Sequence, residues 1–507
     1  MTTLRSILLS GICVMLSWSL GMVEAADTAR TGHFSTTFAE VSPLSAWPEF
    51  LNHAGAMWGI GKGAAESSSY RIADESFDVY VPKSYDGSTA FGLIAFVNSG
   101  KGGGPPGGYD RVCDEQKLIW IGGANVPNER DATDRGRLTV DAVFNIGKTY
   151  RINPERIYVS GMSGGGRVAS HLAVPYADVF TGGSIFLCGC NPFITPSDPV
   201  TAKRVDELAK SHRFAFVTGS DDYNKPGTKD VCAQYQGMKL PYVKYFEQPG
   251  LGHALPSAMT FGEAVTFLDG PLVAKAAAQL AAGKAAENKK QWREAWVAYK
   301  AAAESTVAAS SAAEAKPLLA NAAINLDQDA AKDLEKILVK PQAAAVRGFV
   351  LKWPAELPST VKARGEGERL GGEEFDKLAA AKPSIQVLRT FLKTWDGYDV
   401  CQRALESLNG FAKEAWTKVD ALKPGSARTK AMAKFIVDWS PTATAVTAGE
   451  TLSRDVQAAL TEIAGLATPA AKAGKLQALL SDVKGSTSAT AVENAYAALV
   501  KEAGAKK

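Results

Sequence analysis

The middle of the chain alternates short apolar runs with longer segments of helical periodicity. The runs are four to seven residues long and most are bounded by Gly, Pro, Asn or Asp, as buried strands are. They are Phe77–Val81, Phe91–Val97, Leu118–Ile121, Arg156–Val159, Gly183–Leu187, Phe214–Thr218 and Tyr242–Glu247. Segments between them, such as Asp131–Tyr150 and Arg167–Ala173, have the spacing of crossover helices. Residues 77–270 are therefore predicted to form an α/β domain with a mostly parallel sheet covered by helices.

The two flanks of this region have different patterns. Residues 26–76 are less regular, and we expect them to extend the α/β domain as an edge strand or a segment that wraps the sheet. After Gly270 the composition changes to Ala, Lys and Glu with almost no strand-like runs. We therefore place a domain boundary at Gly270 and predict that residues 271–507 are helical.

An aromatic pair recurs within the helical region. The pairs, each a Phe followed four residues later by a Trp, are Phe349/Trp353, Phe391/Trp395 and Phe435/Trp439, with a weaker copy at Leu479–Val483. Their spacings are 42, 44 and 44 residues. Because residues i and i+4 share a helix face and turn formers follow each pair, each unit is predicted to be a helical hairpin that stacks on the next. The Trp stripe is interpreted as core rather than as a ligand site.

The N-terminus has the pattern of an export signal. Arg5 precedes an apolar stretch over residues 6–21, and Val23-Glu24-Ala25 forms a small-x-small cleavage site. We predict a signal peptide over residues 1–25 and an exported protein. The alternative is an uncleaved anchor over Ile7–Val23, which approaches the roughly 17 residues needed to span a bilayer.

Composition and charge exclude some functions. The chain of 507 residues is too long for one core, and its 46% hydrophobic and 21% charged residues are ordinary for soluble domains. The net charge of +3 is spread along the chain, so no nucleic-acid partner is expected. Cleavage would leave an odd number of cysteines, and their pairing cannot be assigned: Cys113, Cys188, Cys190, Cys232 and Cys401.

One motif in the α/β region carries chemistry. Gly161-Met162-Ser163-Gly164-Gly165 fits G-x-S-x-G, with a predicted strand directly before it and a helical segment directly after it. This strand–elbow–helix setting is the one that the motif requires, and the glycines allow the strained backbone that exposes the serine. Ser163 is therefore the candidate nucleophile. The alternative is an ordinary glycine-rich turn between a strand and a helix.

A serine nucleophile needs a base, and the chain has five histidines. His33 and His53 precede the sheet, His171 is expected to point away from the elbow, and His212 begins the Phe214 strand at the end opposite the site. His253 lies in the loop after the last predicted strand. Because active-site loops gather at the carboxyl ends of parallel strands, His253 is the candidate base.

The acid that orients the histidine should lie between the serine and the histidine in this chain order. The strand that ends at Thr218 is followed by Gly219-Ser220-Asp221-Asp222. We favour Asp222, because a G-x-x-D spacing carries the carboxylate past the glycine turn. Asp221 remains the alternative, and Asp230 is less favoured because it lies farther along, in a predicted helix.

The oxyanion formed by serine attack needs two donors. The amide of Gly164 is the first candidate, and the second is expected from Ser99 or Gly100 in the glycine-rich loop after the Phe91–Val97 strand. This loop lacks the G-x-x-x-x-G-K-[ST] pattern of a phosphate-binding loop. A serine mechanism of this kind needs no metal ion and no organic cofactor.

Residues 77–270 resemble the polyhydroxybutyrate-depolymerase-like and feruloyl-esterase-like branch of the α/β-hydrolases. The resemblance rests on Ile152–Gly166, which holds the serine motif, on Ala177-Asp-Val-Phe180, and on the Thr-Gly-x-x-Asp and Gly-x-Gly-His loops. It implies an acyl-enzyme mechanism with Ser163, His253 and Asp222. Relatives commonly have His-Gly where this chain has Ser99-Gly100. The helical region resembles tetratricopeptide or HEAT hairpins in length and periodicity alone.

Three functional hypotheses follow. The first is an exported esterase that acts on a carboxylic ester, whether monomeric or polymeric. The second is an interaction protein with an inactive hydrolase domain, whose helical repeats bind a protein partner. The third is a serine peptidase of prolyl-oligopeptidase type, ranked lower because the extra region here follows the hydrolase domain. The acyl and alcohol groups of the substrate cannot be read from the sequence.

Overall fold

The computed structural model describes residues 30–505 apart from 62, 67–69, 196–198 and 382. The chain forms two compact units, which divide between Ala322 and Ala323. The predicted signal peptide and its alternative, a membrane anchor, lie outside the described residues. Within the described part of the chain, no helix is long and apolar enough to cross a membrane.

The first unit is built on an eight-stranded sheet in the order β1-β2-β4-β3-β5-β6-β7-β8. The strands are β1 Gly32–Thr37, β2 Ser76–Val81, β3 Phe91–Val97, β4 Leu118–Gly123, β5 Ile152–Met162, β6 Gly183–Leu187, β7 Phe214–Gly219 and β8 Val243–Gln248. β2 runs antiparallel to β1 and β4, and every other pair is parallel. The predicted α/β fold with a mostly parallel sheet is confirmed, and β1 supplies an edge strand from residues 26–76.

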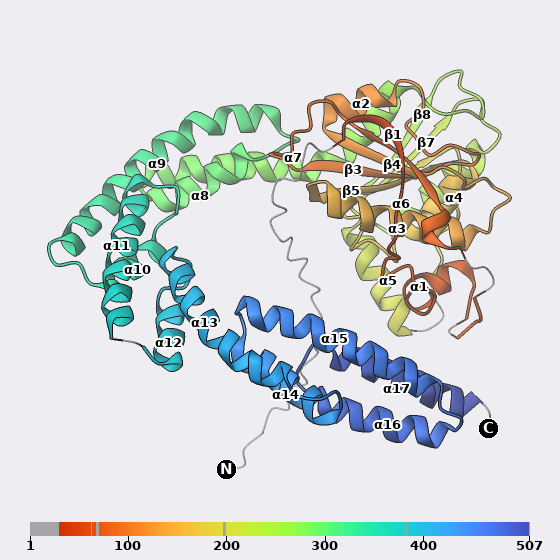
Figure 1. Cartoon of the computed structure of the whole chain (residues 1–507). Helices are drawn as coiled ribbons and strands as arrows, with labels where there is room; N and C mark the ends of the chain where they lie inside the picture. The colour runs from red at the N-terminus through yellow and green to blue at the C-terminus, as the bar shows by residue number, and fades with distance from the viewer. Residues whose placement is uncertain (1–29, 62, 67–69, 196–198, 382, 506–507) are drawn as a thin grey trace, which may run out of the picture. The chain divides into compact units, whose positions relative to one another are not determined.

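Helices cover both faces of this sheet (Figure 1). They are α1 Trp47–Ala54, α2 Tyr109–Gln116, α3 Ala132–Thr149, α4 Gly164–Ala173, α5 Pro199–Ser211, α6 Lys225–Gly237 and α7 Ala258–Asn288, with short 3₁₀ turns at Gly55–Trp58 and Ile72–Asp74. The next helix, α8 Trp292–Ala303, packs on α7 instead of on the sheet. Along β3, Leu93, Ala95 and Val97 pack with α1 and α3–α6, whereas Ile94 and Phe96 pack with α2 and α7. Both faces of the strand are buried, as expected for a parallel sheet between two helical layers.

The predicted boundary at Gly270 falls inside α7, which continues to Asn288. The apolar first half of this helix, with Phe261, Val265 and Leu268, packs on the sheet. Its second half packs with α8 and with the start of α9, Ala309–Leu338. A single helix thus links the sheet to the Ala-rich segment, and the division of the chain into compact units comes later, within α9.

The second unit is helical. From α10 onward its helices pack in consecutive pairs, with a shorter helix first and a longer one second. The pairs are α10 Ala343–Lys352 with α11 Pro358–Ala380, α12 Ile385–Thr394 with α13 Val400–Asp420, α14 Ser426–Trp439 with α15 Ala443–Ala464, and α16 Pro469–Asp482 with α17 Ala489–Ala505. The predicted Phe positions fall on the first helix of a pair. That the pairs form a repeat array of tetratricopeptide or HEAT type stays a prediction.

The aromatic pairs of this unit are buried unequally. Phe349, Phe391 and Phe435 are all core residues. Trp395 is fully buried and packs with Tyr398 and with residues of α11–α13, while Trp353 and Trp439 are half-buried. The Phe positions of the stripe therefore all lie in the core, whereas its Trp positions range from fully buried to half-buried.

His212 is fully buried at the amino end of β7, away from the elbow. Its Nε2 lies 2.6 Å from the Ser184 hydroxyl, at the start of β6. Burial, together with the neighbouring Arg213 charge, lowers the pKa of His212 to about 3.

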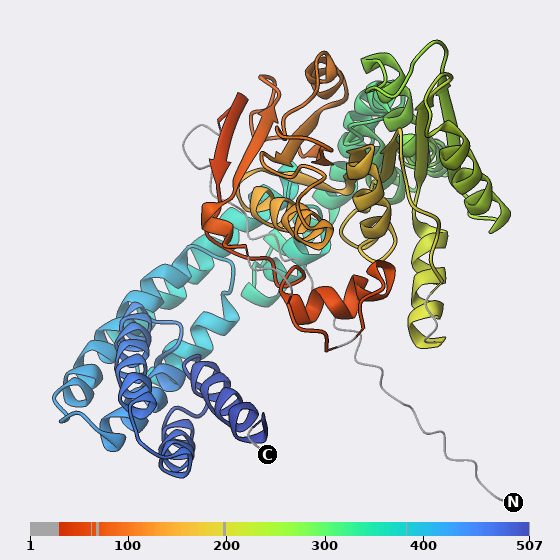
Figure 2. The ribbon, with the colours of Figure 1, turned by 90° about the vertical axis from the view of Figure 1, so that its right-hand side faces the viewer.

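The twist of the sheet, with β1 in red and the later strands in green, is visible in Figure 2.

We expect His212 to weaken the fold in acid. Because its folded-state pKa lies below its ordinary value of 6.5, the unfolded chain binds the proton first. The free energy of unfolding should fall as the pH drops below 6.5, by up to about 1.4 kcal/mol per pH unit. His212→Gln, which keeps a hydrogen-bonding group beside Ser184, should flatten this part of the stability profile in urea titrations at pH 4–7. Parallel profiles for the two proteins would contradict the expectation.

Candidate active site

Ser163 occupies a sharp turn between β5 and α4. Its backbone has φ 53° and ψ −114°, a strained conformation for a residue with a side chain. Its amide donates to the carbonyl of Leu187 on β6 at 2.7 Å, which fixes the turn against the neighbouring strand. The strain is thus held by the sheet, and it presents the serine hydroxyl at the carboxyl end of the strands.

Close backbone packing explains the glycines around the serine. A Cβ at Gly161 would lie 2.3 Å from the carbonyl oxygen of Gly165, and a Cβ at Gly165 would lie 1.9 Å from that of Val97. Neither distance is possible for real atoms, so β3, β5 and α4 can meet here only through glycine. The glycines of the sequence motif are therefore required by the close contact between backbones.

Three side chains from separate loops form a hydrogen-bonded line. The hydroxyl of Ser163 lies 2.9 Å from Nε2 of His253, and Nδ1 of His253 lies 2.8 Å from Oδ1 of Asp222. The loops follow β5, β7 and β8, whose carboxyl ends lie at one edge of the sheet. The structure therefore brings together the three residues that the sequence predicted, in the arrangement of a catalytic triad.

Asp222 is buried, and its hydrogen bonds keep it ionised. Its Oδ2 accepts from the Thr218 hydroxyl at 2.7 Å, and its Oδ1 accepts from the Asn224 amide at 2.8 Å. Burial raises the pKa of the Asp222 carboxyl, but these bonds and the one from His253 outweigh it and hold the pKa below its ordinary value. A charged Asp222 orients the ring of His253 and would stabilise its cationic form.

The alternative acids and bases lie elsewhere. Asp221 is exposed and accepts a hydrogen bond from Ser220, and Asp230 is exposed on α6. His33 lies on β1, His53 in the last turn of α1, and His212 at the amino end of β7. His171 was expected to point away from the elbow, yet it lines the same cavity as Ser163 because α4 runs along that cavity. In the described part of the chain, none of these side chains forms a hydrogen bond with Ser163 or His253.

The loop after β3 turns its amides toward one of its own side chains. The amides of Ser99 and Gly100 donate to Oδ1 of Asn98, at 2.8 and 3.4 Å. Neither residue lines the cavity at Ser163. The Gly164 amide, by contrast, follows the nucleophile directly at the start of α4. The oxyanion role of Ser99 and Gly100 stays a prediction.

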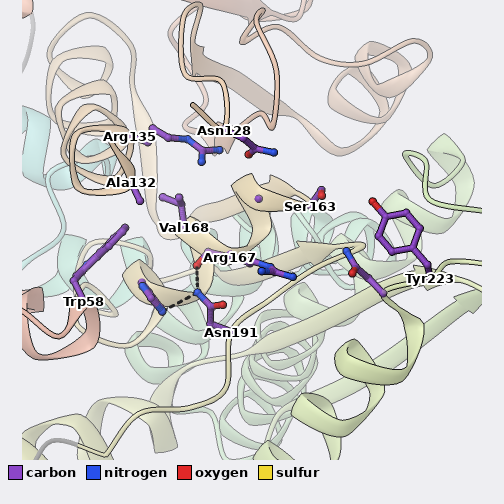
Figure 3. A pocket seen from close by; sticks show the side chains of 12 residues that line it. Trp58, Asn128, Ala132, Arg135, Ser163, Arg167, Val168, Asn191 and Tyr223 are labelled. Carbon is purple, nitrogen blue, oxygen red and sulfur yellow. Dashed lines mark hydrogen bonds between the residues drawn. The ribbon is translucent and has the colours of Figure 1, made fainter. Parts of the chain in front are cut away.

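A cavity of about 500 Å³ opens beside Ser163 (Figure 3). It is lined by Trp58, Asn128, Ala132, Arg135, Ser163, Gly164, Arg167, Val168, His171, Asn191, Tyr223 and Asn224. The sequence reasoning missed Asn128, whose carboxamide lies so close that a Cβ on Gly164 would meet its Oδ1 at 2.0 Å. It also missed Arg135 and Arg167. Arg167 follows Ser163 by four residues, about one helical turn, and that spacing was a usable signal.

Other potentially reactive groups near the site are restrained. Cys188 Sγ donates to the Ala254 carbonyl, and burial beside Asp222 raises the pKa of its thiol to about 12. All five cysteines of the described chain are free. Within the same residues, no group of three or more His, Cys, Asp or Glu side chains is placed to hold a metal ion.

The backbone packing at the elbow can be tested with one methyl group. Gly165→Ala should lower the free energy of unfolding by about 1–3 kcal/mol, because the new Cβ has to displace the Val97 carbonyl. Gly147→Ala in α3 is the matched control, since its Cβ would meet no atom within 4 Å, and it should stabilise the protein by about 0.5–1 kcal/mol. Equal urea midpoints for the two variants would contradict this reading.

The chain matches no protein-family model and no curated protein sequence. Among solved structures it is similar to an S-formylglutathione hydrolase from Staphylococcus aureus, with 12% identity over 47% of this chain and 98% of that one and a TM-score of 0.32. It is also similar to an esterase from Thermogutta terrifontis, with 13% identity over 42% of this chain and 92% of that one and a TM-score of 0.31. Matches at this level carry no argument about function, which has to come from the site itself.

Proposed function

We propose that this chain is an exported serine hydrolase that cleaves carboxylic esters through an acyl-enzyme intermediate. The observation that carries the proposal is the hydrogen-bonded line from Asp222 through His253 to a serine held at a strained strand-to-helix turn. Geometry of this kind converts a weakly nucleophilic hydroxyl into a reactive one. Export follows from the predicted signal over residues 1–25.

Each residue has a defined task in this mechanism. Ser163 Oγ attacks the ester carbonyl while Nε2 of His253 takes its proton, and the C–O bond to the alcohol breaks as His253 returns that proton to the departing oxygen. Water then attacks the acyl-enzyme with His253 again as base, which releases the acid and restores Ser163. Asp222 holds the imidazole in the required tautomer and stabilises its positive charge.

The oxyanion requires two donors, and we assign one to the Gly164 amide. For the second we favour the Asn128 carboxamide over the predicted Ser99 and Gly100 amides, because it lines the cavity next to Gly164 while those amides donate to Asn98. An asparagine side chain carries two N–H donors and can turn them toward a developing charge.

The Asn98 hydrogen bonds also favour one competing function. A loop whose amides are already satisfied is what an inactive hydrolase domain would retain, and the helical second unit would then bind a protein partner. The two functions differ in one simple respect, which is whether Ser163 reacts.

Reaction of Ser163 can be measured directly. A fluorophosphonate probe should label the purified protein at Ser163, and Ser163→Ala should abolish both the labelling and the hydrolysis of p-nitrophenyl butyrate. Peptide mapping of the labelled protein identifies the residue. A folded protein that takes up no probe would remove the enzyme proposal and leave the binding function.

The adjacent aspartates provide a matched pair. Asp222→Asn should lower kcat by about 10⁴-fold, because the amide stabilises the wrong histidine tautomer. Asp221→Asn, one residue away and exposed, should leave kcat within about twofold. The measurement is steady-state hydrolysis of p-nitrophenyl butyrate. A larger loss for Asp221→Asn than for Asp222→Asn would reverse the assignment.

The oxyanion assignment has its own test. Asn128→Ala should lower kcat by about 10²-fold with little change in KM, since the lost donor acts on charge that develops in the transition state. Asn125→Ala, an exposed position on the same loop, is the control. If kcat of Asn128→Ala stays within twofold of wild type, Asn128 is not the second donor.

A further inference from the structure

Two arginine side chains extend into the cavity beside Ser163. Arg135 comes from α3 and Arg167 from α4, and Figure 3 shows them on two sides of the space next to the serine. None of the described residues that line the cavity is an Asp or a Glu. The cavity therefore has a positive charge that its own walls do not neutralise.

Arg135 is buried without a carboxylate partner. The residue is 3% exposed, its Nη2 donates to the Asn98 carbonyl at 2.8 Å, and its Nε has no hydrogen-bond partner among the described residues. Burial lowers the pKa of its guanidinium, while the charge of nearby Glu129 acts in the opposite direction. A buried cation that lacks an ion pair is costly, so its retention in a cavity favours a role in holding an anion.

Arg167 and His171 lie one helical turn apart on α4, and both line the cavity. Arg167 is exposed and forms no ion pair within the described residues. Nε2 of His171 accepts from the Asn191 side chain at 2.8 Å, so the ring proton is on Nδ1, which has no partner in the described chain. Burial lowers the pKa of His171 to about 4, so the ring is neutral at pH 7 and adds no charge to the cavity wall.

The position of the base indicates which half of an ester would lie here. The departing alcohol oxygen has to lie beside Nε2 of His253 to receive its proton. His253 does not itself line the cavity, but Tyr223, whose ring lies 4.2 Å from that of His253, does, and from there the cavity extends over α4 toward Trp58. We therefore place the departing alcohol at the end next to Tyr223 and His253, and the acyl group in the part of the cavity over α4. Trp58, Ala132 and Val168 give that cavity an apolar wall for a short carbon chain.

We propose, building on the esterase function above, that the preferred substrates carry a carboxylate on the acyl group, held by the guanidinium groups of Arg135 and Arg167. A guanidinium matches a carboxylate in both planarity and spacing of donors, and a desolvated pair of this kind is stronger than a neutral hydrogen bond. The acyl-enzyme would then be a half-ester of a dicarboxylic acid on Ser163, and hydrolysis would release the free diacid.

The test compares esters that differ in this charge and by one methyl group. Mono-p-nitrophenyl esters of succinic, glutaric and adipic acid are each paired with the neutral p-nitrophenyl methyl diester of the same acid. For at least one chain length, the full-length protein should show a kcat/KM at least about tenfold higher for the anionic ester, and this preference should shrink as salt is added.

Variants connect the preference to the two arginines. Arg167→Gln should lower the ratio of anionic to neutral kcat/KM by about tenfold, and Arg167→Lys should restore part of it because the charge is kept. Arg135→Lys is the second variant, with thermal melting used to verify its fold. Arg111→Gln on α2, an exposed arginine outside the cavity, should leave the ratio unchanged.

The outcomes separate the two proposals. Hydrolysis of both esters at equal rates, or a ratio unaffected by Arg167→Gln, would overturn the anionic-acyl inference while the esterase function stands. No hydrolysis of any ester together with no fluorophosphonate labelling would overturn the esterase function itself. Faster hydrolysis of the neutral esters would show that the two arginines do not bind the carboxylate of the acyl group. That result would also overturn the inference.

Discussion

The site depends on the contact between backbones at Ser163. The end of β5, the start of α4 and the end of β3 approach so closely that Cβ atoms at Gly161 and Gly165 have no room. This contact and the bond from the Ser163 amide to Leu187 hold the serine at positive φ. A strained residue persists only when its surroundings determine it fully, and here the centre of a parallel sheet does so. The position of the nucleophile is thus a property of the whole sheet.

The parallel sheet also explains how distant residues meet. Ser163, Asp222 and His253 are spread over 90 residues, but each follows a parallel strand, and such strands all end at the same edge. The Thr218 hydroxyl and the Asn224 amide then fix Asp222, which in turn fixes the ring of His253. Because hydrogen bonds hold both the carboxylate and the imidazole in place, the reacting atoms need little rearrangement.

The cavity beside Ser163 adds positive charge and an apolar wall to this arrangement. Its charge comes from α3 and α4, the two helices that flank the elbow, while its apolar wall includes Trp58 from the segment before β2. That segment gave no chemical signal in the sequence, yet it closes one side of the space next to Ser163. The helical second unit has a core of its own, which includes Phe391, Trp395 and Leu408.

The sequence by itself determined the fold class and the candidates Ser163, His253 and Asp222, while it left open whether residues 26–76 form an edge strand or wrap the sheet. Strand periodicity and the G-x-S-x-G motif are local patterns, and the order of the strands' carboxyl ends follows from parallel pairing. The tertiary structure alone decided which aspartate meets His253, where the Ser99 and Gly100 amides point, and that Asn128, Arg135 and Arg167 share a cavity. Those outcomes depend on side-chain directions and on helix packing across the chain, which no local pattern encodes.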